Sequence, residues 1–254
     1  MPFNPLLEKP TSFAQPGLEM TPMPFVTAVE SQLRPLSNKE RAEQMSAYLL
    51  NQFEFLGLPA PIRRAAVKDL LRHHWESGDE LIVAVRQLWA LREREFRYTA
   101  IDLLRYQHRL LNPKHLSVLQ QLLLQDAWWE TVDGLSAVIG KILLAESRVN
   151  PEALRVTDDW IDHPDFWVRR SAMLHQLGWR LRTDHTRLSR HALQLAGEKE
   201  FFIRKAIGWA LRDYARWNPA WVMVFITEHH DKLSGLTIRE ATKHLPRKGK
   251  NVGL

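Results

Sequence analysis

The stretch Asp126-Ala-Trp-Trp-Glu-Thr-Val-Asp-Gly134 begins the longest helical pattern in the chain. Asp126 is suited to cap the N-terminus of a helix, and Glu130 falls in its first turns. The apolar residues that follow recur at helical spacing: Leu135, Val138, Ile139, Ile142 and Leu143. This pattern predicts a helix over residues 128–145.

Trp129 and Asp133 are four residues apart, so they share one face of that helix. An aromatic face beside a carboxylate attracts a positively charged guest, because the ring quadrupole and the anion act in the same direction. The pattern also fits a simpler arrangement, in which Trp128 and Trp129 pack in the core and Asp133 is a solvated helix carboxylate. The stretch alone leaves both interpretations open.

Further helical patterns follow one another on both sides of this stretch, separated by Pro, Gly and Asn. Ser77 or Asp79 caps one of them, and no segment shows the period-two alternation of a strand. The fold class is therefore all-α. Besides the helix at 128–145 and a short one near Ile238, the predicted helices cover residues 24–33, 38–50, 61–73, 79–91, 96–110, 113–124, 151–162, 165–181, 184–196, 201–217 and 219–230.

A short motif recurs in these helices: a large polar or basic residue, any residue, Ala and usually an aliphatic residue. Its first positions are separated by 34, 72, 34 and 35 residues, and Asp133 lies near the middle of the long step. Such a period, with two antiparallel helices in each unit, predicts an α-solenoid of HEAT or TPR type, in which the small Ala allows close packing. The copies begin at Arg64, Tyr98, Arg170, Arg204 and Arg239.

Equivalent positions on stacked helices form a row, so these residues are expected to line one concave surface with Asp133 in the middle. A basic row of this kind follows a nucleic-acid backbone, because each arginine can neutralise a phosphate or bind it with two hydrogen bonds. An alternative is that the arginines tie neighbouring helices together or solvate a face, as in solenoids that bind only protein.

Composition sets broad limits on the class of protein. The 254 residues carry a formal charge of +6, which favours a polyanionic partner, and they include no Cys, which excludes disulfides and thiolate metal sites. We expect a Pro-rich arm at residues 1–22, a repeat domain at 23–245 and a basic tail at 246–254. No apolar run spans a membrane and no histidine pair has metal-ligand spacing, so a cytoplasmic monomer without cofactor or metal is expected.

Several motifs resemble those of the AlkD-type DNA alkylation repair glycosylases, a family of HEAT-like repeat proteins. The resemblance covers about residues 24–245. It rests on Tyr48 followed by Phe53-Glu-Phe-Leu-Gly57, and on Pro61-Ile-Arg-Arg64, Trp128-Trp-Glu-Thr-Val-Asp133, Trp167-Val-Arg-Arg170 and Lys199-Glu-Phe-Phe-Ile-Arg-Lys-Ala-Ile-Gly-Trp209.

The resemblance implies a role for particular residues. Asp133 corresponds to the catalytic carboxylate, Trp129 and Trp209 to tryptophans of the concave site, Arg170 to a residue that holds the DNA backbone, and Tyr48 to a further site aromatic. Glu130 stands where the family more often has Asp, at a carboxylate that is not the catalytic one. Some related proteins keep the fold and lack glycosylase activity.

The implied substrate is duplex DNA that contains N3- or N7-alkylated purines. Such a base is a cation and leaves without protonation, so the enzyme has to stabilise an oxocarbenium-like sugar and present water to it. Asp133 suits that task, and the two tryptophans suit a cationic guest. The alternatives are a non-catalytic binder of damaged or structured DNA with the same fold, and a protein-binding helical scaffold.

Overall fold

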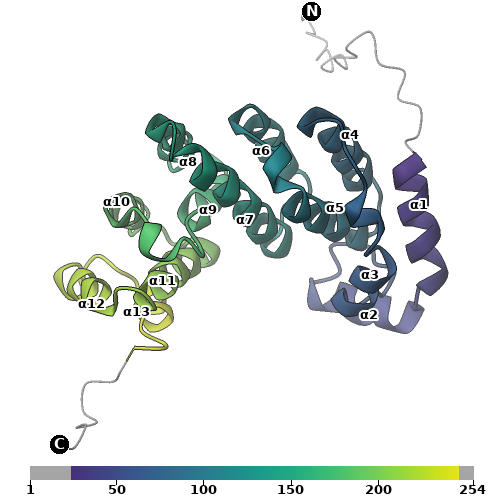
Figure 1. Cartoon of the computed structure of the whole chain (residues 1–254). Coiled ribbons are helices and arrows are strands. Elements are labelled where there is room, and N and C mark those ends of the chain that lie inside the picture. Colours follow the sequence, from purple (N-terminus) through teal and green to yellow (C-terminus); the bar gives the residue numbers. More distant parts are fainter. Residues whose placement is uncertain (1–23, 246–254) are drawn as a thin grey trace, which may run out of the picture.

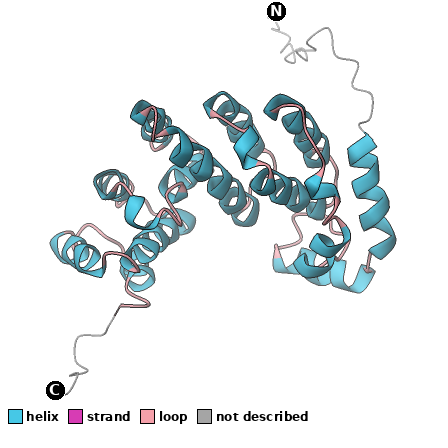
Figure 2. Cartoon of the chain, in the orientation of Figure 1, coloured by secondary structure: helices cyan, strands magenta, loops and turns pink. Residues whose placement is uncertain are grey.

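The computed structural model describes residues 24–245, and these form thirteen α-helices with short 3₁₀ helices between them. Figure 2 shows helices joined by loops, which confirms the all-α prediction for this part of the chain. None of the described helices is long and apolar enough to cross a membrane. The predicted arm at 1–22 and tail at 246–254 lie outside the described residues.

The helices stand in two layers that bend into an arc, as Figure 1 shows. In the inner layer, α5, α7, α9, α11 and α13 contact one another in chain order, and α4, α6, α8 and α10 each pack on the inner helix that follows. The bounds are α1 Pro24–Leu33, α2 Lys39–Tyr48, α3 Ala60–Ala66, α4 Gly78–Trp89, α5 Arg94–Tyr106, α6 Leu116–Leu124, α7 Trp129–Glu146, α8 Arg155–Trp160, α9 Phe166–Leu174, α10 His185–Gln194, α11 Phe201–Ala215, α12 Pro219–Glu228 and α13 Gly235–Ala241.

The repeated motif sets the spacing of the inner layer. Its alanines at positions 100, 172, 206 and 241 are each 0% exposed, so the helices approach closely where the motif predicts a small side chain. Between α7 and α9, the hydroxyl of Ser136 donates to the hydroxyl of Ser171 at 3.0 Å. The prediction of a helical-repeat solenoid is confirmed.

Side-chain caps fix most helix starts. Ser77 accepts a hydrogen bond from the backbone N–H of Glu80 at the start of α4, which resolves the two predicted capping candidates in its favour. Further caps at the starts of α2, α9, α10, α11, α12 and α13 are supplied by Asn38, Asp165, Asp184, Glu200, Asn218 and Ser234.

The helix predicted over 165–181 ends early, because α9 stops at Leu174. Gly178 then has a φ of +79°, a left-handed conformation that interrupts a helix. The backbone N–H of Gly178 donates to the carboxylate of Asp213 on α11 at 2.8 Å. The chain therefore leaves the helix to make a contact with the next repeat, which local periodicity does not reveal. The helix predicted over 61–73 is likewise shorter, since α3 ends at Ala66.

Gly140 on α7 lies at a close approach between α7 and the segment that follows α9. A Cβ at this position would lie 2.0 Å from the backbone oxygen of His175. We expect Gly140→Ala to lower the free energy of unfolding by about 1–3 kcal/mol, because packed helices must separate. Gly197→Ala is the control, since its Cβ would meet nothing within 4 Å. Denaturant unfolding curves measure both, and equal stabilities for the two variants would contradict the proposed contact.

Candidate functional site

A cleft of about 500 Å³ opens where the end of α2 faces α7, α9, α11 and α13. It brings together five residues singled out from the sequence: Tyr48, Trp129, Asp133, Arg170 and Trp209. These residues come from four helices and are up to 161 positions apart in the chain, so the repeat fold assembles them. The rest of the lining consists of Leu50, Trp128, Phe201, Phe202, Lys205, Arg212 and Glu240.

A two-point ion pair between α7 and α9 lies at the base of this cleft. Arg170 donates from Nε to Oδ1 of Asp133 at 2.8 Å and from Nη2 to Oδ2 at 2.9 Å. Its Nη1 donates to the backbone oxygen of Phe202 on α11. The side chains of Arg170 and Asp133 are only 3% and 13% exposed, so the carboxylate is held in one orientation.

Burial raises the pKa of the Asp133 carboxyl above its ordinary value, and the Arg170 guanidinium opposes this rise. Glu130 adds to the rise, while Lys205 acts against it. At a pH above its folded-state pKa, Asp133 is ionised and its desolvation lowers the stability of the fold. Protonation removes this cost as the pH falls through that pKa. Arg170 is the contact that most favours the anion.

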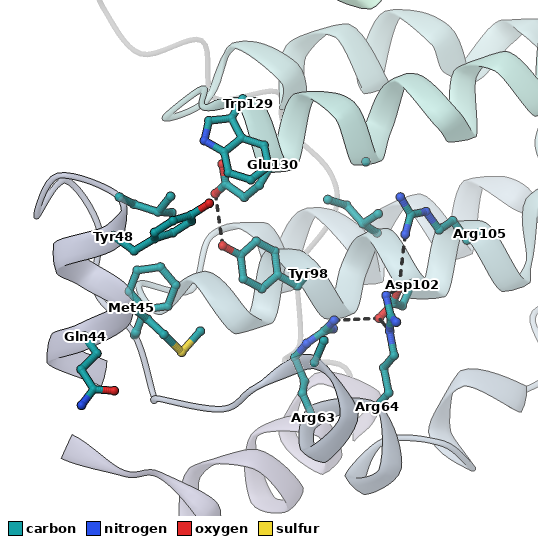
Figure 3. Close-up of a pocket in the computed structure, with 15 residues that line it drawn as sticks. Gln44, Met45, Tyr48, Arg63, Arg64, Tyr98, Asp102, Arg105, Trp129 and Glu130 are labelled. Atoms are coloured by element: carbon teal, nitrogen blue, oxygen red, sulfur yellow. Dashed lines mark hydrogen bonds and ion pairs between the residues drawn. The ribbon is translucent and has the colours of Figure 1, made fainter. Parts of the chain in front are cut away.

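Aromatic rings form two sides of the cleft. Trp129 is the first residue of α7, and its ring meets that of Tyr48 edge-on, with centroids 6.4 Å apart. Figure 3 shows these two side chains projecting toward each other from α2 and α7. Tyr48 is 74% exposed, and Trp209 on α11 is half-buried. Aromatic surface therefore borders the buried carboxylate, as predicted.

Glu130, another carboxylate of the stretch 126–134, has a different environment from that of Asp133. Glu130 accepts from Nε of the buried Arg94 at 2.7 Å and from the hydroxyl of Tyr98 at 3.2 Å. Arg94 also donates to the backbone oxygen of Asp126 at 2.9 Å and to Thr131 at 3.1 Å. Glu130 therefore fixes the start of α7 by contacts with α5, which agrees with a structural role.

The prediction that Asp126 caps this helix is wrong. The N-cap position belongs to Trp128, whose side chain makes no capping hydrogen bond. Asp126 has a φ of +45°, and its carboxylate instead accepts from Arg97. The arginines of α5 thus hold the segment that precedes α7 by donating to it, but as donors they do not cap the free N–H groups of the helix. The contact between Arg97 and Asp126 spans 29 positions in the chain.

A second cavity of about 440 Å³ lies on the other side of the Tyr48–Trp129 pair, between α2, α3, α5 and α7. Arg64, a predicted DNA contact, lines this cavity and not the cleft. Asp102 binds both Arg63 and Arg64, at 2.8 and 2.9 Å. Figure 3 draws the contact between Arg63 and Asp102 at the edge of this cavity. Arg64 is 53% exposed, so it keeps accessible surface while it joins α3 to α5.

The residues at the first position of the repeated motif were predicted to line one surface, but only some of them are available to a partner. Arg170 and Tyr98 are turned into contacts with the neighbouring repeat, as described above. Arg204 donates from Nε to the backbone oxygen of Glu198 at 2.7 Å, and Arg239 is exposed on α13. Neither Arg204 nor Arg239 lines either cavity. The contact of Arg204 and Arg239 with DNA stays a prediction. Arg170 instead ties neighbouring helices together, as the alternative interpretation of the motif proposed.

Some cleft residues were not singled out by sequence reasoning. Lys205, one position after a motif arginine, lies 5.5 Å from the Phe201 ring centroid and faces the cleft. Phe202 packs against Trp128 and Trp167. Phe202 and Lys205 both lie within the motif 199–209, on which the resemblance partly rests. Their proximity to Asp133 could therefore have been inferred from that motif. Leu50 carried no such indication.

The whole repeat array matches a protein-family model. Residues 29–245 match the model described as DNA alkylation repair enzyme. The chain belongs to this family. From this membership it follows that the protein is an enzyme of DNA alkylation repair and binds DNA. A search of curated proteins found no similar sequence.

Two solved structures support the placement in the DNA alkylation repair family. One is described as a predicted DNA alkylation repair enzyme from Enterococcus faecalis, with 33% identity, a TM-score of 0.77, and coverage of 83% of this chain and 97% of that chain. The other, AlkD2 from Streptococcus mutans, shares 16% identity with a TM-score of 0.59, over 87% of this chain and 97% of that chain. At that identity the second likeness concerns the fold alone.

The Arg170–Asp133 pair predicts a measurable pKa change in this repair protein. In Arg170→Gln, the carboxylate stays buried but loses its cationic partner, so we expect the pKa of Asp133 to rise further. Titration of the carboxyl carbon by NMR measures this value directly. Arg169→Gln is a matched control, because Arg169 binds Glu198 instead. An unchanged pKa of Asp133 in Arg170→Gln would mean that the pair does not control its ionisation.

Proposed function

We propose that the protein is a DNA glycosylase that hydrolyses the N-glycosidic bond of N3- and N7-alkylated purines in duplex DNA, and that it acts as a monomer. The observation that carries the proposal is the geometry of Asp133: a buried carboxylate, oriented by Arg170 and bordered by Trp129 and Trp209. Membership of the DNA alkylation repair family supports the choice of substrate class.

The chemistry needs little from the protein beyond a fixed anion. In 7-methylguanine or 3-methyladenine nucleosides the base is already positively charged, so it departs with the bonding electrons as a neutral molecule. The sugar then carries the positive charge, and Asp133 stabilises it electrostatically. Water adds its oxygen to C1′ and releases a proton to Asp133 or to solvent.

Asp133 has the capacity for this role although Arg170 already binds it. An ionised carboxylate has about four acceptor positions, and Arg170 occupies one on each oxygen. The remaining positions are available to a water molecule and to the developing charge. Because the guanidinium fixes both oxygens, no reorganisation of the carboxylate is needed during the reaction.

A second candidate is a non-catalytic binder of damaged DNA. It is favoured by one observation, namely that a bidentate Arg170 can make Asp133 a purely structural partner between α7 and α9. Release of 7-methylguanine from methylated duplex DNA separates the two candidates. Membership of the DNA alkylation repair family disfavours a protein-binding scaffold. A measurement also separates the two: a DNA repair protein should bind duplex DNA with an affinity that falls steeply with salt, and a scaffold should not.

We expect Asp133→Asn to reduce excision of 7-methylguanine by about 10²–10³, the usual effect of removing one preorganised electrostatic group. Duplex affinity should stay close to that of the wild type. Glu130→Gln is the matched control: it removes the neighbouring carboxylate charge, which binds Arg94, and should lower thermal stability while the folded protein keeps its rate. Single-turnover kinetics and melting curves measure both, and full activity of Asp133→Asn would exclude Asp133 from the mechanism.

The raised pKa of Asp133 sets the acid side of the pH–rate profile. Only the anion stabilises the sugar cation, so excision should fall as the pH drops through the raised pKa, at a higher pH than for an ordinary aspartate.

Selectivity should follow the charge of the lesion. The wild type is expected to release 7-methylguanine and 3-methyladenine and to leave hypoxanthine, uracil and 1,N6-ethenoadenine, which are neutral. Trp209→Leu keeps apolar bulk but removes the quadrupole, a loss of about 0.5–2 kcal/mol, so both cationic purines should be released a few-fold to tens-fold more slowly. Trp217→Leu, at a partly exposed tryptophan outside the cleft, is the control. Release of hypoxanthine as fast as 7-methylguanine would refute selection by charge.

A further inference from the structure

We propose that a basic patch at the C-terminal ends of the inner helices binds phosphates of the duplex about six base pairs to one side of the lesion, so that the protein covers DNA asymmetrically. This distal patch consists of Arg109, Lys141, Arg148, Arg182 and Arg216. The inference rests on the proposed function for the place of the lesion beside Asp133, and on family membership for the DNA itself.

The residues at the first position of the repeated motif all lie near the N-terminal ends of the inner helices. Asp133 and Arg170 are the fifth residues of α7 and α9, Tyr98 and Arg239 are the fifth residues of α5 and α13, and Arg204 is the fourth residue of α11. At 1.5 Å per residue, about 6 Å of α7 precedes Asp133 and about 20 Å follows it. The lesion cleft therefore lies near one edge of the inner layer, and most of α7 extends to the other side of it.

The arc of the inner layer determines the direction in which DNA passes. Its helices lie side by side around the arc, as Figure 1 shows, so they form a trough that is open along the helices. A duplex is stiff over this length, because its persistence length is about 150 base pairs, and it therefore lies along the trough. With a rise of about 3.4 Å per base pair, the C-terminal end of α7 lies about six base pairs from the lesion.

A basic cavity opens at that end of the trough. It has a volume of about 450 Å³ and lies between the second half of α7 and the segment after α9. Ala137 and Lys141 belong to its lining and follow Asp133 by about one and two helical turns, so the cavity continues the face of α7 that carries Asp133. None of its lining residues is acidic, and the ionisable ones are His108, Lys141, Arg148 and Arg182.

The arginines beside the lesion are neutralised by carboxylates. Arg170 is paired with Asp133 at 2.8 Å and Arg212 with Glu240 at 2.7 Å. Of the Lys and Arg residues that line the cleft, only Lys205 lacks a carboxylate partner among the described residues. Because the salt-dependent affinity for DNA grows with the number of phosphates that are neutralised, the cleft alone offers few free contacts to the backbone of a duplex.

The cations of the distal cavity are free by comparison. Within the part of the chain that the structure describes, no carboxylate forms an ion pair with Lys141, Arg148 or Arg182. All three side chains are exposed, and Lys141 makes one long hydrogen bond, to the backbone oxygen of Arg105 at 3.5 Å. Positive charge without a counter-charge attracts a polyanion, and each guanidinium can bind a phosphate with two hydrogen bonds. The duplex that lies along the trough brings its phosphates to this place.

The test uses the full-length protein and measures binding by fluorescence anisotropy over a range of salt concentrations. Each duplex carries one 7-methylguanine whose 2′-fluoro sugar resists cleavage. In a long duplex the lesion is central. In two short duplexes it lies about three base pairs, roughly 10 Å, from one end or from the other, so one of the two lacks the DNA that would reach the distal patch.

Three double variants are compared with the wild type. The first is Arg148→Ala with Arg182→Ala, and the second places Lys at the same two positions. The control is Arg86→Ala with Arg155→Ala, which removes the same charge from exposed arginines of the outer layer, on α4 and α8. Because all four side chains are exposed, melting temperatures should stay close to that of the wild type, and melting curves check this.

We expect the alanine pair at positions 148 and 182 to bind the long duplex about ten-fold more weakly, with a salt slope smaller by about two, one for each lost phosphate contact. The lysine pair should keep the slope of the wild type, because Lys also neutralises phosphate. The wild type should bind one short duplex clearly more tightly than the other, and only for the tighter one should the alanine pair lose affinity. The outer-layer control should bind as the wild type.

Two results would overturn the proposal. One is an alanine pair that binds the long duplex with the affinity and salt slope of the wild type, which would assign the distal patch to an acidic protein partner instead. The other is equal binding of the two short duplexes, with equal sensitivity to the alanine pair. Release of 7-methylguanine from a duplex with ordinary sugars is measured separately. Asymmetric binding without release would support the distal patch and refute the glycosylase, and release with symmetric binding would do the reverse.

Discussion

The bidentate contact between Arg170 and Asp133 is the interaction on which the site depends. It joins α7 to α9, and through the backbone oxygen of Phe202 it reaches α11. Breaking it would leave a buried carboxylate without its counter-ion, a far larger cost than losing a surface ion pair. The same contact that holds three repeats in register therefore also fixes the orientation and ionisation of the anion that the proposed chemistry uses.

Arginine–carboxylate pairs also join other repeats, but these pairs differ in whether the carboxylate faces an open cleft. Arg94 is buried and spends its donors on Glu130, Thr131 and the chain before α7, so that carboxylate serves the fold. Asp133 differs because it lines an open cleft beside aromatic side chains. One solenoid therefore uses the same pairing chemistry to stabilise the fold at Glu130 and, in the proposed function, to orient a reactive group at Asp133.

The sequence was sufficient to predict the fold and to single out several residues that line the cleft. Helical spacing and the Ala motif predict the solenoid, and recognised motifs mark Asp133, Arg170 and Trp209. What it missed depends on distant contacts. Asp126 looks like a cap in isolation, but Arg97 holds it from 29 positions away. Leu50 looks like an ordinary helix-end residue, since a left-handed conformation leaves no trace when the residue is not Gly.

The charges of the cleft act over two different ranges. Lys205, Arg170 and Arg212 outnumber Asp133 and Glu240, so at a distance the cleft attracts the phosphates of DNA, as the whole chain does with its charge of +6. At contact distance the order reverses, because the Arg170 side chain is 3% exposed and that of Asp133 is 13% exposed, so a base beside them meets mainly the carboxylate and the aromatic faces. Screening by salt weakens the first effect much more than the second. In the proposed function, the protein therefore binds any duplex through the phosphates of the DNA and still responds, at short range, to the positive charge that distinguishes an alkylated purine from an intact one.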